Sequence, residues 1–417
     1  MSMIITEKKF KNIEIFYADS GGGHKSVADA IRQEMISRVP AYKVSVVNGA
    51  IHGNEWYAKI TDLYKYSVLH ARHLYTSFYN MTNGVLQTRV LERLIKIVFV
   101  SEVERYFQKK EIDLLISCHP FFNLLMPHFI HENTSAKFVS VITDPITPHA
   151  HNFSPNVDLC IVSSDYAKDI ALQQGVDPMR IKVIGHPVLK AFAKKNINKK
   201  TILHNIGLRE DICTILISGG ADGLGRIYDT VKKLAEIKLP IQLIVICGRN
   251  KCLYNRIEKN IKNENIRIFG FTNIIADLMR SADILVAKPG ASTMCEAFSI
   301  GLPIVIFDAI IGQELGNMSH IIDNHAGVYC KNLESLVEEV EKLVNNPDRR
   351  KSMSIASKKL SNNDAVIKIV DECLLLIDDH QKSQFDSLGI VPTEDVVSEI
   401  NISYEYEKRN SKECSVA

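Results

Sequence analysis

The residues best suited to chemistry lie in the stretch 283–317, where an apolar run ends at a glycine turn. Gly290 closes that turn, and the small hydroxyl residues Ser292 and Thr293 open the helix predicted to follow. The free N–H groups and the positive end of a helix N-terminus bind phosphate groups. Glu296 lies one turn inside the helix, where a carboxylate can hold a ribose diol. The spacing therefore predicts a nucleotide site.

A second polar cluster follows the next apolar run and consists of Gln313, Glu314 and Asn317. Carboxamide and carboxylate groups form hydrogen bonds with sugar hydroxyls. Because this cluster comes shortly after the predicted phosphate site, it indicates the sugar part of the same ligand. Together, the two clusters predict a site for a nucleotide sugar.

A glycine-rich loop follows the first predicted strand and reads Gly21, Gly22, Gly23 and then His24. Although Lys25 comes next, the loop lacks the glycine spacing of a phosphate-binding P-loop. Three glycines let the backbone approach a ligand closely, and a neutral imidazole can take a proton from an attacking hydroxyl. We therefore predict His24 as a catalytic base. The alternative is a turn in which this histidine only caps the helix.

Other candidates in the first half follow later predicted strands. His119 comes after the strand at 114–117, and Asp144 and His149 come after the next strand. Ligands bind at the carboxyl ends of parallel strands, so Asp144 and His119 are the next candidates for the base, and His149 is a candidate for the acceptor site. Asp144 can also be a simple turn residue. His149 and His151 have no third partner at metal-ligand spacing, and we predict no metal.

Length and composition describe an ordinary two-domain protein. The 417 residues exceed one average domain, and 46% of them are hydrophobic, enough for two cores. A net charge of +2 argues against a nucleic-acid partner. Nine cysteines without C-x-x-C spacing indicate reduced thiols in a cytoplasmic protein. The first residues lack the apolar core of a signal peptide, and no run approaches the ~20 apolar residues of a membrane span.

Short apolar runs alternate with helical patterns, as in parallel sheets covered on both faces. We predict strands at 13–17, 44–47, 114–117, 138–142, 159–162, 212–217, 243–246, 266–269, 284–287 and 304–307. The alternation predicts an α/β fold with two Rossmann-like, doubly wound domains. The predicted parts are a first domain at 1–190, a linker at 191–208, a second domain at 209–360, a helix at 361–379 that crosses back to the first domain, and a polar tail at 380–417.

The order of these motifs resembles that of the monogalactosyldiacylglycerol synthases and the processive diacylglycerol glucosyltransferases, a group similar to glycosyltransferase family 28. Matching stretches include DSGGGHKSVADAI, LISGGADGLGRI and IRIFGFTNIIADLMRSADILVAKPG. The resemblance implies the GT-B fold, in which two Rossmann-like domains face each other across a cleft. It also implies inverting transfer of a hexose from a UDP-sugar to a membrane lipid hydroxyl, most of all that of diacylglycerol. The family needs no cofactor or metal, and this chain has no Asp-x-Asp motif.

The resemblance also implies a set of donor-binding residues in the second half of the chain. These are Gly219, Gly220, Arg249, Phe271, Gly290, Ser292, Thr293, Glu296, Gln313, Glu314 and Asn317. Gly219 and Gly220 match a loop near the phosphates, and a plain turn is the alternative. For Arg249 the alternatives are neutralisation of the pyrophosphate and a surface ion pair. Phe271 is a candidate for packing near the uracil, whereas Phe269 is expected in the core.

The segment 57–110 is aromatic, apolar and basic, a combination typical of helices at a membrane interface. Apolar and basic residues recur at helical spacing: Leu91, Leu94, Ile95 and Val98, with Arg89, Arg93 and Lys96. We predict contact with an anionic membrane surface, the alternative being a helix packed on its own domain. With a lipid acceptor, the expected location is peripheral, at the cytoplasmic face of a membrane.

The resulting expectation is an enzyme that uses UDP-glucose or UDP-galactose, and the sequence leaves the choice between these sugars open. Two alternatives share the fold: a UDP-N-acetylglucosamine-dependent transferase with another lipid-linked acceptor, and a UDP-sugar 2-epimerase. A third alternative, of another class, is a non-catalytic UDP-sugar sensor.

Overall fold

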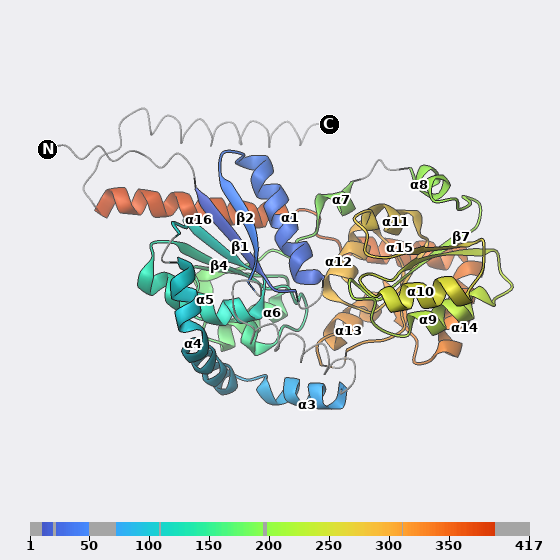
Figure 1. Ribbon diagram of the computed structural model, residues 1–417, viewed down its shortest axis with the longest axis horizontal. Coiled ribbons are helices and arrows are strands. Elements are labelled where there is room, and N and C mark those ends of the chain that lie inside the picture. Colours follow the sequence, from blue (N-terminus) through green and yellow to red (C-terminus); the bar gives the residue numbers. More distant parts are fainter. Residues whose placement is uncertain are drawn as a thin grey trace. The chain divides into compact units, whose positions relative to one another are not determined.

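The computed structural model divides the chain into two units of very different size. The first unit spans residues 1–370 and the second spans 371–417. The residues that the structure describes are 11–19, 22–49, 72–107, 110–194, 198–310 and 312–387. Two β-sheets, both within the first unit, organise the fold (Figure 1).

The first sheet has six parallel strands in the order β2-β1-β3-β4-β5-β6. The strands are β1 (Asn12–Tyr17), β2 (Lys43–Asn48), β3 (Leu114–Ser117), β4 (Lys137–Val141), β5 (Leu159–Val162) and β6 (Ile181–Val183). The helices between them are α1 (Gly23–Arg38), α3 (Arg72–Thr82), α4 (Val85–Phe107), α5 (Pro120–Asn133), η1 (Ala150–Asn152), α6 (Asp165–Gln173) and η2 (Pro178–Arg180). Because the chain leaves β1 first to one side and then to the other, the topological switch point lies between β1 and β3.

The second sheet repeats this plan, with the order β12-β11-β10-β7-β8-β9. Its strands are β7 (Cys213–Ser218), β8 (Ile241–Ile246), β9 (Ile266–Phe269), β10 (Ile284–Ala287), β11 (Ile304–Ile306) and β12 (Gly327–Tyr329). The helices after β6 are α7 (Lys190–Ala193), α8 (Lys199–Asn205), α9 (Ile227–Ala235), α10 (Lys251–Asn260), α11 (Ile275–Ser281), α12 (Ala291–Ile300), α13 (Leu315–Asp323), α14 (Leu333–Asn345), α15 (Pro347–Lys359) and α16 (Ala365–Ser387). The switch point lies between β7 and β10.

The strands are continuously apolar because each face of the sheet meets its own core. In β7, Ile215 and Ile217 belong to one buried cluster, whereas Leu216 belongs to another. Successive side chains of a strand point to opposite faces, so a strand covered on both sides needs apolar residues at every position. This arrangement confirms the predicted α/β fold with two doubly wound sheets.

Two strands were not predicted from the sequence, β6 and β12. Both are edge strands of three residues, and two residues of each are not buried. A short, half-covered strand has no continuous apolar run, so it carries no clear pattern. The other ten strands lie at the predicted positions to within two residues at either end. The predicted domain limits, and the return of the 361–379 helix to the first domain, stay predictions; the structure has α16 there, and the residues after 387 lie outside the described ones.

In doubly wound sheets, ligands bind where the strand order reverses, beyond the carboxyl ends of the strands. In the first sheet this place is formed by the residues after β1 and β3, which include His24 and His119. In the second sheet it is formed by the residues after β7 and β10, which include Gly219 and Gly290. The topology therefore places most of the predicted site residues at the two switch points.

Candidate active site

His24 lies in the first turn of α1. Its Nδ1 is 2.8 Å from the carbonyl oxygen of Cys118, which can only accept a hydrogen bond. The proton of the neutral ring is therefore on Nδ1, and Nε2 keeps a lone pair that can accept a proton. The hydroxyl oxygen of Thr143 is 3.0 Å from the same Nδ1. Burial lowers the pKa of His24 to about 4, against the effect of the Cys118 carbonyl, so the ring is neutral near pH 7.

His119 lies beside His24, with the two ring centroids 4.5 Å apart. It is the N-cap of α5, and its Nδ1 accepts a hydrogen bond from the backbone N–H of Phe121 at 3.2 Å. Burial, reinforced by the neighbouring His24 and His151, lowers its pKa well below the ordinary value. The structure thus brings two predicted candidates for the base together, but one ring nitrogen of His119 is engaged in capping.

Asp144, three residues after β4, meets the segment predicted to read the sugar. Its pKa is raised to about 6, chiefly by burial and also by the charge of Glu314. Hydrogen bonds from Asn152 and Gln313 act in the opposite direction and lower the pKa. A carboxyl group with this pKa can exchange a proton near neutral pH. Asp144 is thus in contact with Gln313 and remains a second candidate for acid–base chemistry.

His149 is held firmly inside the protein. Its side chain is 1% exposed, and its Nε2 is 2.9 Å from the carbonyl oxygen of Tyr79. Its Nδ1 accepts a hydrogen bond from the backbone N–H of His151 at the start of η1. Both ring nitrogens are therefore engaged in contacts within the protein that join α3 to η1, and a role of His149 in the acceptor site stays a prediction.

The start of α12 is the predicted phosphate site. Gly290 is the N-cap residue, and among the described residues no side chain caps the helix. The first turn, which contains Ser292 and Thr293, has no acidic residue. The first N–H groups of a helix need acceptors, and the positive helix end attracts anions. The geometry of α12 therefore fits the diphosphate of a nucleotide sugar.

Two glycines of the first loop bring α1 into contact with this phosphate site. A Cβ atom on Gly23 would lie 3.1 Å from the hydroxyl oxygen of Ser292, and one on Gly22 would lie 2.5 Å from the Cβ of Ala221. The loop therefore needs glycine for close approach to the β7 and β10 loops. Gly21, the first residue of the predicted triplet, lies outside the described residues.

Glu296 faces α1 across the same junction. Its Oε1 is 3.4 Å from the hydroxyl oxygen of Ser26. Burial raises the pKa of Glu296 to about 8, against the hydrogen bond from Ser26, which lowers it. The carboxyl group is therefore mostly protonated near pH 7, and its weak contact with Ser26 is one that a ribose hydroxyl can replace.

The predicted sugar-reading cluster divides into two kinds of residue. Glu314 is 6% exposed, and its Oε2 accepts a hydrogen bond from the backbone N–H of Ile310 at 2.7 Å. Asn317 is 3% exposed and donates to the carbonyl oxygen of Pro289 at 3.0 Å, which ties α13 to the phosphate turn. Gln313 is half-buried and bonds to Asp144. Gln313 is thus the member best placed to meet a ligand, and the other two position the loop.

Arg249 forms an ion pair, the second of the two roles considered for it. Its Nη1 is 2.8 Å from both carboxylate oxygens of Asp19, and its Nε is 3.1 Å from Asp222. The guanidinium carbon is also 5.7 Å from the centroid of the Phe271 ring, which is 65% exposed. Arg249 therefore joins the loop after β1 to the loop after β7.

The glycines after β7 shape the turn beside this ion pair. A Cβ on Gly219 would lie 2.2 Å from the carbonyl oxygen of Leu224, and Gly220 has a φ of +75°. Both positions therefore require glycine for the turn itself. A second role near the phosphates stays a prediction. Phe269, by contrast, packs against the core of the second sheet, as expected.

Sequence analysis does not point to three residues that the structure places here: Asp19, Thr143 and His186. His186 is 5% exposed, and its Nε2 is 3.4 Å from the hydroxyl oxygen of Ser292. It follows the edge strand β6, which has no apolar pattern of its own. Recognition of that strand would have placed His186 at the end of a parallel strand, where ligands bind.

Two family models match the chain, one in the part with the first sheet and one in the part with the second. Residues 24–188 match the family model of monogalactosyldiacylglycerol (MGDG) synthase, and residues 214–369 match the glycosyltransferase family 28 C-terminal domain. In the described residues, no group of three or more His, Cys, Asp or Glu side chains is arranged to hold a metal ion.

Two curated plant proteins match most of the chain. Monogalactosyldiacylglycerol synthase 3, chloroplastic, of Arabidopsis thaliana is 30% identical over 386 residues, which cover 88% of this chain and 81% of the relative. The probable monogalactosyldiacylglycerol synthase 2, chloroplastic, of Oryza sativa subsp. japonica is 28% identical over 375 residues, with coverage of 87% and 80%.

Solved structures share the fold at low sequence identity. MurG of Acinetobacter baumannii has a TM-score of 0.56 at 13% identity, with 87% of this chain and 99% of that chain covered. A putative UDP-N-acetylglucosamine 2-epimerase of Listeria monocytogenes has a TM-score of 0.56 at 14% identity, with 89% and 97% covered. The likeness to both structures confirms the predicted GT-B fold. Because the two TM-scores are equal, the fold alone does not distinguish a transferase from an epimerase.

Proposed function

We propose that this chain, which belongs to the monogalactosyldiacylglycerol synthase family, transfers a hexose from a UDP-sugar to the hydroxyl group of diacylglycerol. One observation supports this best: His24 on α1 and the uncapped start of α12 meet at the two switch points. Sugar transfer to an alcohol needs both, because the alcohol must lose a proton while a diphosphate leaves.

The second sheet supplies the donor site in this proposal. The N–H groups at the start of α12 bind the diphosphate, and Glu296 accepts hydrogen bonds from the ribose. Gln313 contacts the hexose from the side of Asp144. The names of the relatives favour galactose as the transferred sugar.

The first sheet supplies the base. Nε2 of His24 takes the proton of the acceptor hydroxyl, and the acceptor oxygen attacks the anomeric carbon on the face opposite the diphosphate. The bond from that carbon to the diphosphate oxygen breaks, and its electron pair leaves with the UDP. Attack opposite the leaving group inverts the anomeric carbon. The hydrogen bond from Nδ1 to Cys118 holds the ring in the required tautomer.

We also propose that the reaction needs no metal, because the positive helix ends stabilise the charge on the leaving diphosphate. Activity should therefore be unchanged after treatment with EDTA. A loss of activity that Mg²⁺ or Mn²⁺ restores would overturn this part of the proposal.

The acceptor side of the proposal depends on α4. Its solvent face carries large apolar side chains: Leu86 at 74% exposure, Val90 at 50%, Leu94 at 56%, Ile97 at 74% and Val98 at 55%. Their spacing of three and four residues places them on one stripe of the helix. We propose that this stripe enters the acyl boundary of a membrane. No helix in the described part of the chain is long and apolar enough to cross a membrane.

The stripe differs from the one predicted from the sequence. Leu94 and Val98 are exposed as expected, but Leu91 is half-buried and Ile95 packs against the core of the first sheet. The predicted pattern therefore combined residues from two faces of α4. The helix both packs on its own domain and exposes an apolar face, so the two readings of the sequence describe different sides of one helix.

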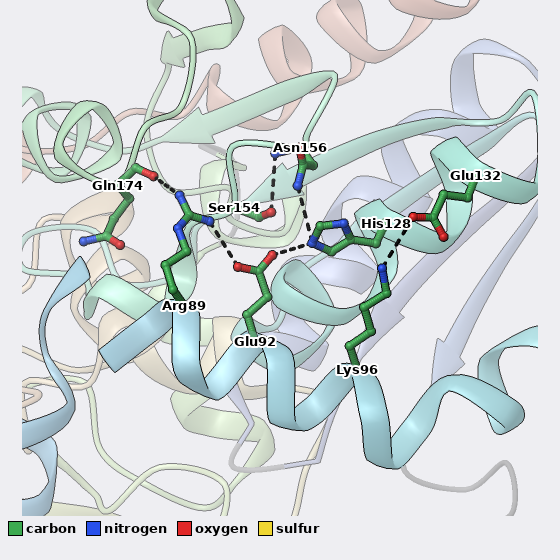
Figure 2. A network of polar contacts seen from close by, with 8 residues as sticks. All are labelled: Arg89, Glu92, Lys96, His128, Glu132, Ser154, Asn156 and Gln174. Atoms are coloured by element: carbon green, nitrogen blue, oxygen red, sulfur yellow. Dashed lines mark hydrogen bonds and ion pairs between the residues drawn. The ribbon is translucent and has the colours of Figure 1, made fainter. Parts of the chain in front are cut away.

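A polar network joins α4 to α5 and to the end of α6 in the first domain (Figure 2). Glu92 is 6% exposed and bonds to Arg89 at 3.0 Å and to His128 on α5 at 2.6 Å. Burial acts to raise the pKa of Glu92, but the hydrogen bonds from His128 and Arg89 outweigh it and lower the pKa. Arg89 also donates to the Gln174 carbonyl at 2.8 Å.

Two of the three basic residues predicted to meet the membrane form ion pairs within the protein. Arg89 pairs with Glu92, and Lys96 pairs with Glu132 at 3.4 Å. Arg93 is exposed and lies next to Leu94. We therefore propose that apolar contact leads, with attraction to anionic headgroups as a smaller term. The eight cysteines in the described residues are free thiols, which supports placement at the cytoplasmic face.

The test is a transfer assay with product analysis. The purified chain is incubated with vesicles that contain diacylglycerol and, in separate reactions, with radiolabelled UDP-galactose, UDP-glucose or UDP-N-acetylglucosamine. We expect a glycosyl-diacylglycerol from one of the two hexose donors. Formation of a 2-epimer of the donor without glycolipid would establish the epimerase instead. Tight donor binding without any product would establish the sensor.

A further inference from the structure

His186 is a buried imidazole with few polar contacts. Its side chain is 5% exposed, the backbone carbonyl of Thr143 lies close to the ring, and Nδ1 makes no hydrogen bond of ordinary geometry with a described residue. Its Nε2 points to the Ser292 hydroxyl, 3.4 Å away, which is at the long end of a hydrogen bond. Buried polar atoms without good partners cost free energy, so they often mark a place that a ligand completes.

The place to which His186 points attracts anions. Ser292 is the second residue of α12, a helix of ten residues without a side-chain cap within the described part of the chain. The start of α1 also lacks such a cap, and Gly23 at that start lies against Ser292. Neither first turn has an acidic residue. Two positive helix ends therefore meet beside the imidazole.

The groups around His186 favour its neutral ring, so the ring can become charged only when an anion binds beside it. Burial lowers the pKa of His186 to about 4; the nearby His24 lowers it further, and the carbonyl of Thr143 raises it. From α12, Glu296 lies on the same helix face as Ser292, but its raised pKa keeps it mostly neutral. From α1, His24 is neutral as well, as is His119 behind it.

We propose that His186 is a ligand of the donor diphosphate, and that it becomes an imidazolium when the nucleotide sugar occupies the start of α12. The proposal rests on the proposed function and deepens it, because it names the residue that supplies a positive charge at that site. The ring turns its Nε2–H from Ser292 to a phosphate oxygen and donates a charge-assisted hydrogen bond.

The proton balance of this step is simple. One proton passes from solvent to His186 as the donor binds, because the negative diphosphate favours the charged ring. The bond between sugar and diphosphate then breaks, and the imidazolium faces the negative charge that grows on the diphosphate. When UDP leaves, His186 returns the proton to solvent.

Proton uptake on binding tests the proposal directly. Binding of UDP-galactose and of UDP-glucose is measured by calorimetry at pH 6.5 in two buffers with different ionisation enthalpies. These nucleotide sugars have no phosphate group that titrates near this pH, so uptake reports on the protein. We expect uptake of more than about half a proton per nucleotide in the wild type. Uridine, which lacks the diphosphate, should bind without uptake.

Two variants locate the proton. In His186→Gln we expect no proton uptake and donor binding weaker by about tenfold to a hundredfold, the range of a lost charge-assisted hydrogen bond. His186→Asn serves as a second substitution if the first does not fold. His24→Gln is the matched control, because it changes the neighbouring histidine; it should keep the proton uptake.

The outcomes separate this proposal from the proposed function. Donor binding without proton uptake in the wild type, or uptake that persists in His186→Gln, would overturn the role of His186 and leave the transferase intact. Loss of uptake in His24→Gln alone would assign the proton to His24 and equally reject His186. Absence of binding by both UDP-sugars would overturn both proposals.

Discussion

At the scale of single residues, the proposed mechanism depends on how the His24 ring is oriented. The N–H at Nδ1 donates a hydrogen bond to the Cys118 carbonyl, so Nε2 is the nitrogen that can act as the proposed base. We expect His24→Ala to lower kcat by at least ~100-fold, the usual effect of losing a general base. The Kd for UDP-sugar, measured by calorimetry, should change little.

The neighbouring Lys25 offers a control for this variant. Its Nζ pairs with Asp29 at 2.6 Å on the outer side of α1, and its side chain is 47% exposed. Lys25→Ala should keep kcat within about twofold, since surface pairs of this kind contribute little. Equal losses of kcat in the two variants would point to damage to α1 and not to the loss of a base.

The raised pKa of Glu296 predicts how the free energy of unfolding depends on pH. Its pKa is raised to about 8 in the folded protein, from 4.5 for an ordinary glutamate, so between these values the folded state holds a proton that the unfolded state has released. Stability must therefore fall as the pH rises through this window. Because His24 and His186 have pKa values of about 4, their contribution has ended by pH 7.

The measurement is urea unfolding of wild type and Glu296→Gln at several pH values between 6.8 and 8. We expect the free energy of unfolding to fall more steeply in the wild type than in Glu296→Gln, by at most about 1.4 kcal/mol per pH unit, the limit for one proton. The glutamine variant cannot lose the proton and should show a flatter profile. Parallel profiles of the two proteins would mean that Glu296 is ionised in the folded state.

The sequence predicted the position of residues well where a motif surrounds them. The Gly290–Glu296 stretch and the Gly22–His24 loop follow parallel strands, as predicted, and their roles stay predictions. It could not show that both ring nitrogens of His149 are engaged, because their partners Tyr79 and His151 depend on tertiary packing. His186 could not be predicted for the same reason, because its partner Ser292 is more than a hundred residues away in sequence.

At the scale of elements, we predict that α4 binds the membrane through its exposed apolar side chains. Leu86 and Ile97 are each 74% exposed, so replacing them should not disturb the core. Burial of one such side chain in a membrane contributes roughly 1.5–3 kcal/mol. We expect Leu86→Glu and Ile97→Glu each to weaken binding to diacylglycerol-containing vesicles by about tenfold or more, as measured by flotation.

Met179, on η2, provides the matched control for α4. It is 85% exposed but lies outside the stripe, so Met179→Glu should bind vesicles as the wild type does. Activity toward a short-chain, water-soluble diacylglycerol should be kept in all three variants. Unchanged vesicle binding by both α4 variants would show that another surface meets the membrane.

Sequence patterns predict some of these elements better than others. A buried parallel strand is recognisable because every residue is apolar, as in β8, where all six residues are buried. A helix with one packed and one exposed apolar face is ambiguous, because both faces of α4 contribute Leu, Ile and Val to the same stretch. Only the contacts of Glu92 and Ile95 show which side faces inward.

At the scale of the whole molecule, we expect function to depend on contact between the loops of the two sheets. The ion pair of Arg249 with Asp19 and the contact of Ser26 with Glu296 both join residues of α1 or its loop to the donor site. Both are partly exposed or long, and such contacts are weak. In the proposed mechanism the donor binds to the loops of the second sheet and the base belongs to the first, so catalysis should be more sensitive to this junction than stability is.

Gly22 allows this idea to be tested by a pair of substitutions. Its φ is −80°, which any residue adopts, so Gly22→Ala introduces no backbone strain. The new Cβ would instead lie 2.5 Å from the Cβ of Ala221, too close for any real contact, and one loop must move. A displacement of about 1 Å between reacting groups can cost on the order of 100-fold in rate.

We therefore expect Gly22→Ala to lower kcat/KM for transfer by at least about tenfold, with the melting temperature almost unchanged. Ala221→Gly removes the other Cβ atom and should by itself have a small effect. The double variant should regain most of the lost activity, because the two loops can again approach. A double variant as inactive as Gly22→Ala would show that the glycine acts through α1 alone, and that catalysis does not require this contact between the two sheets.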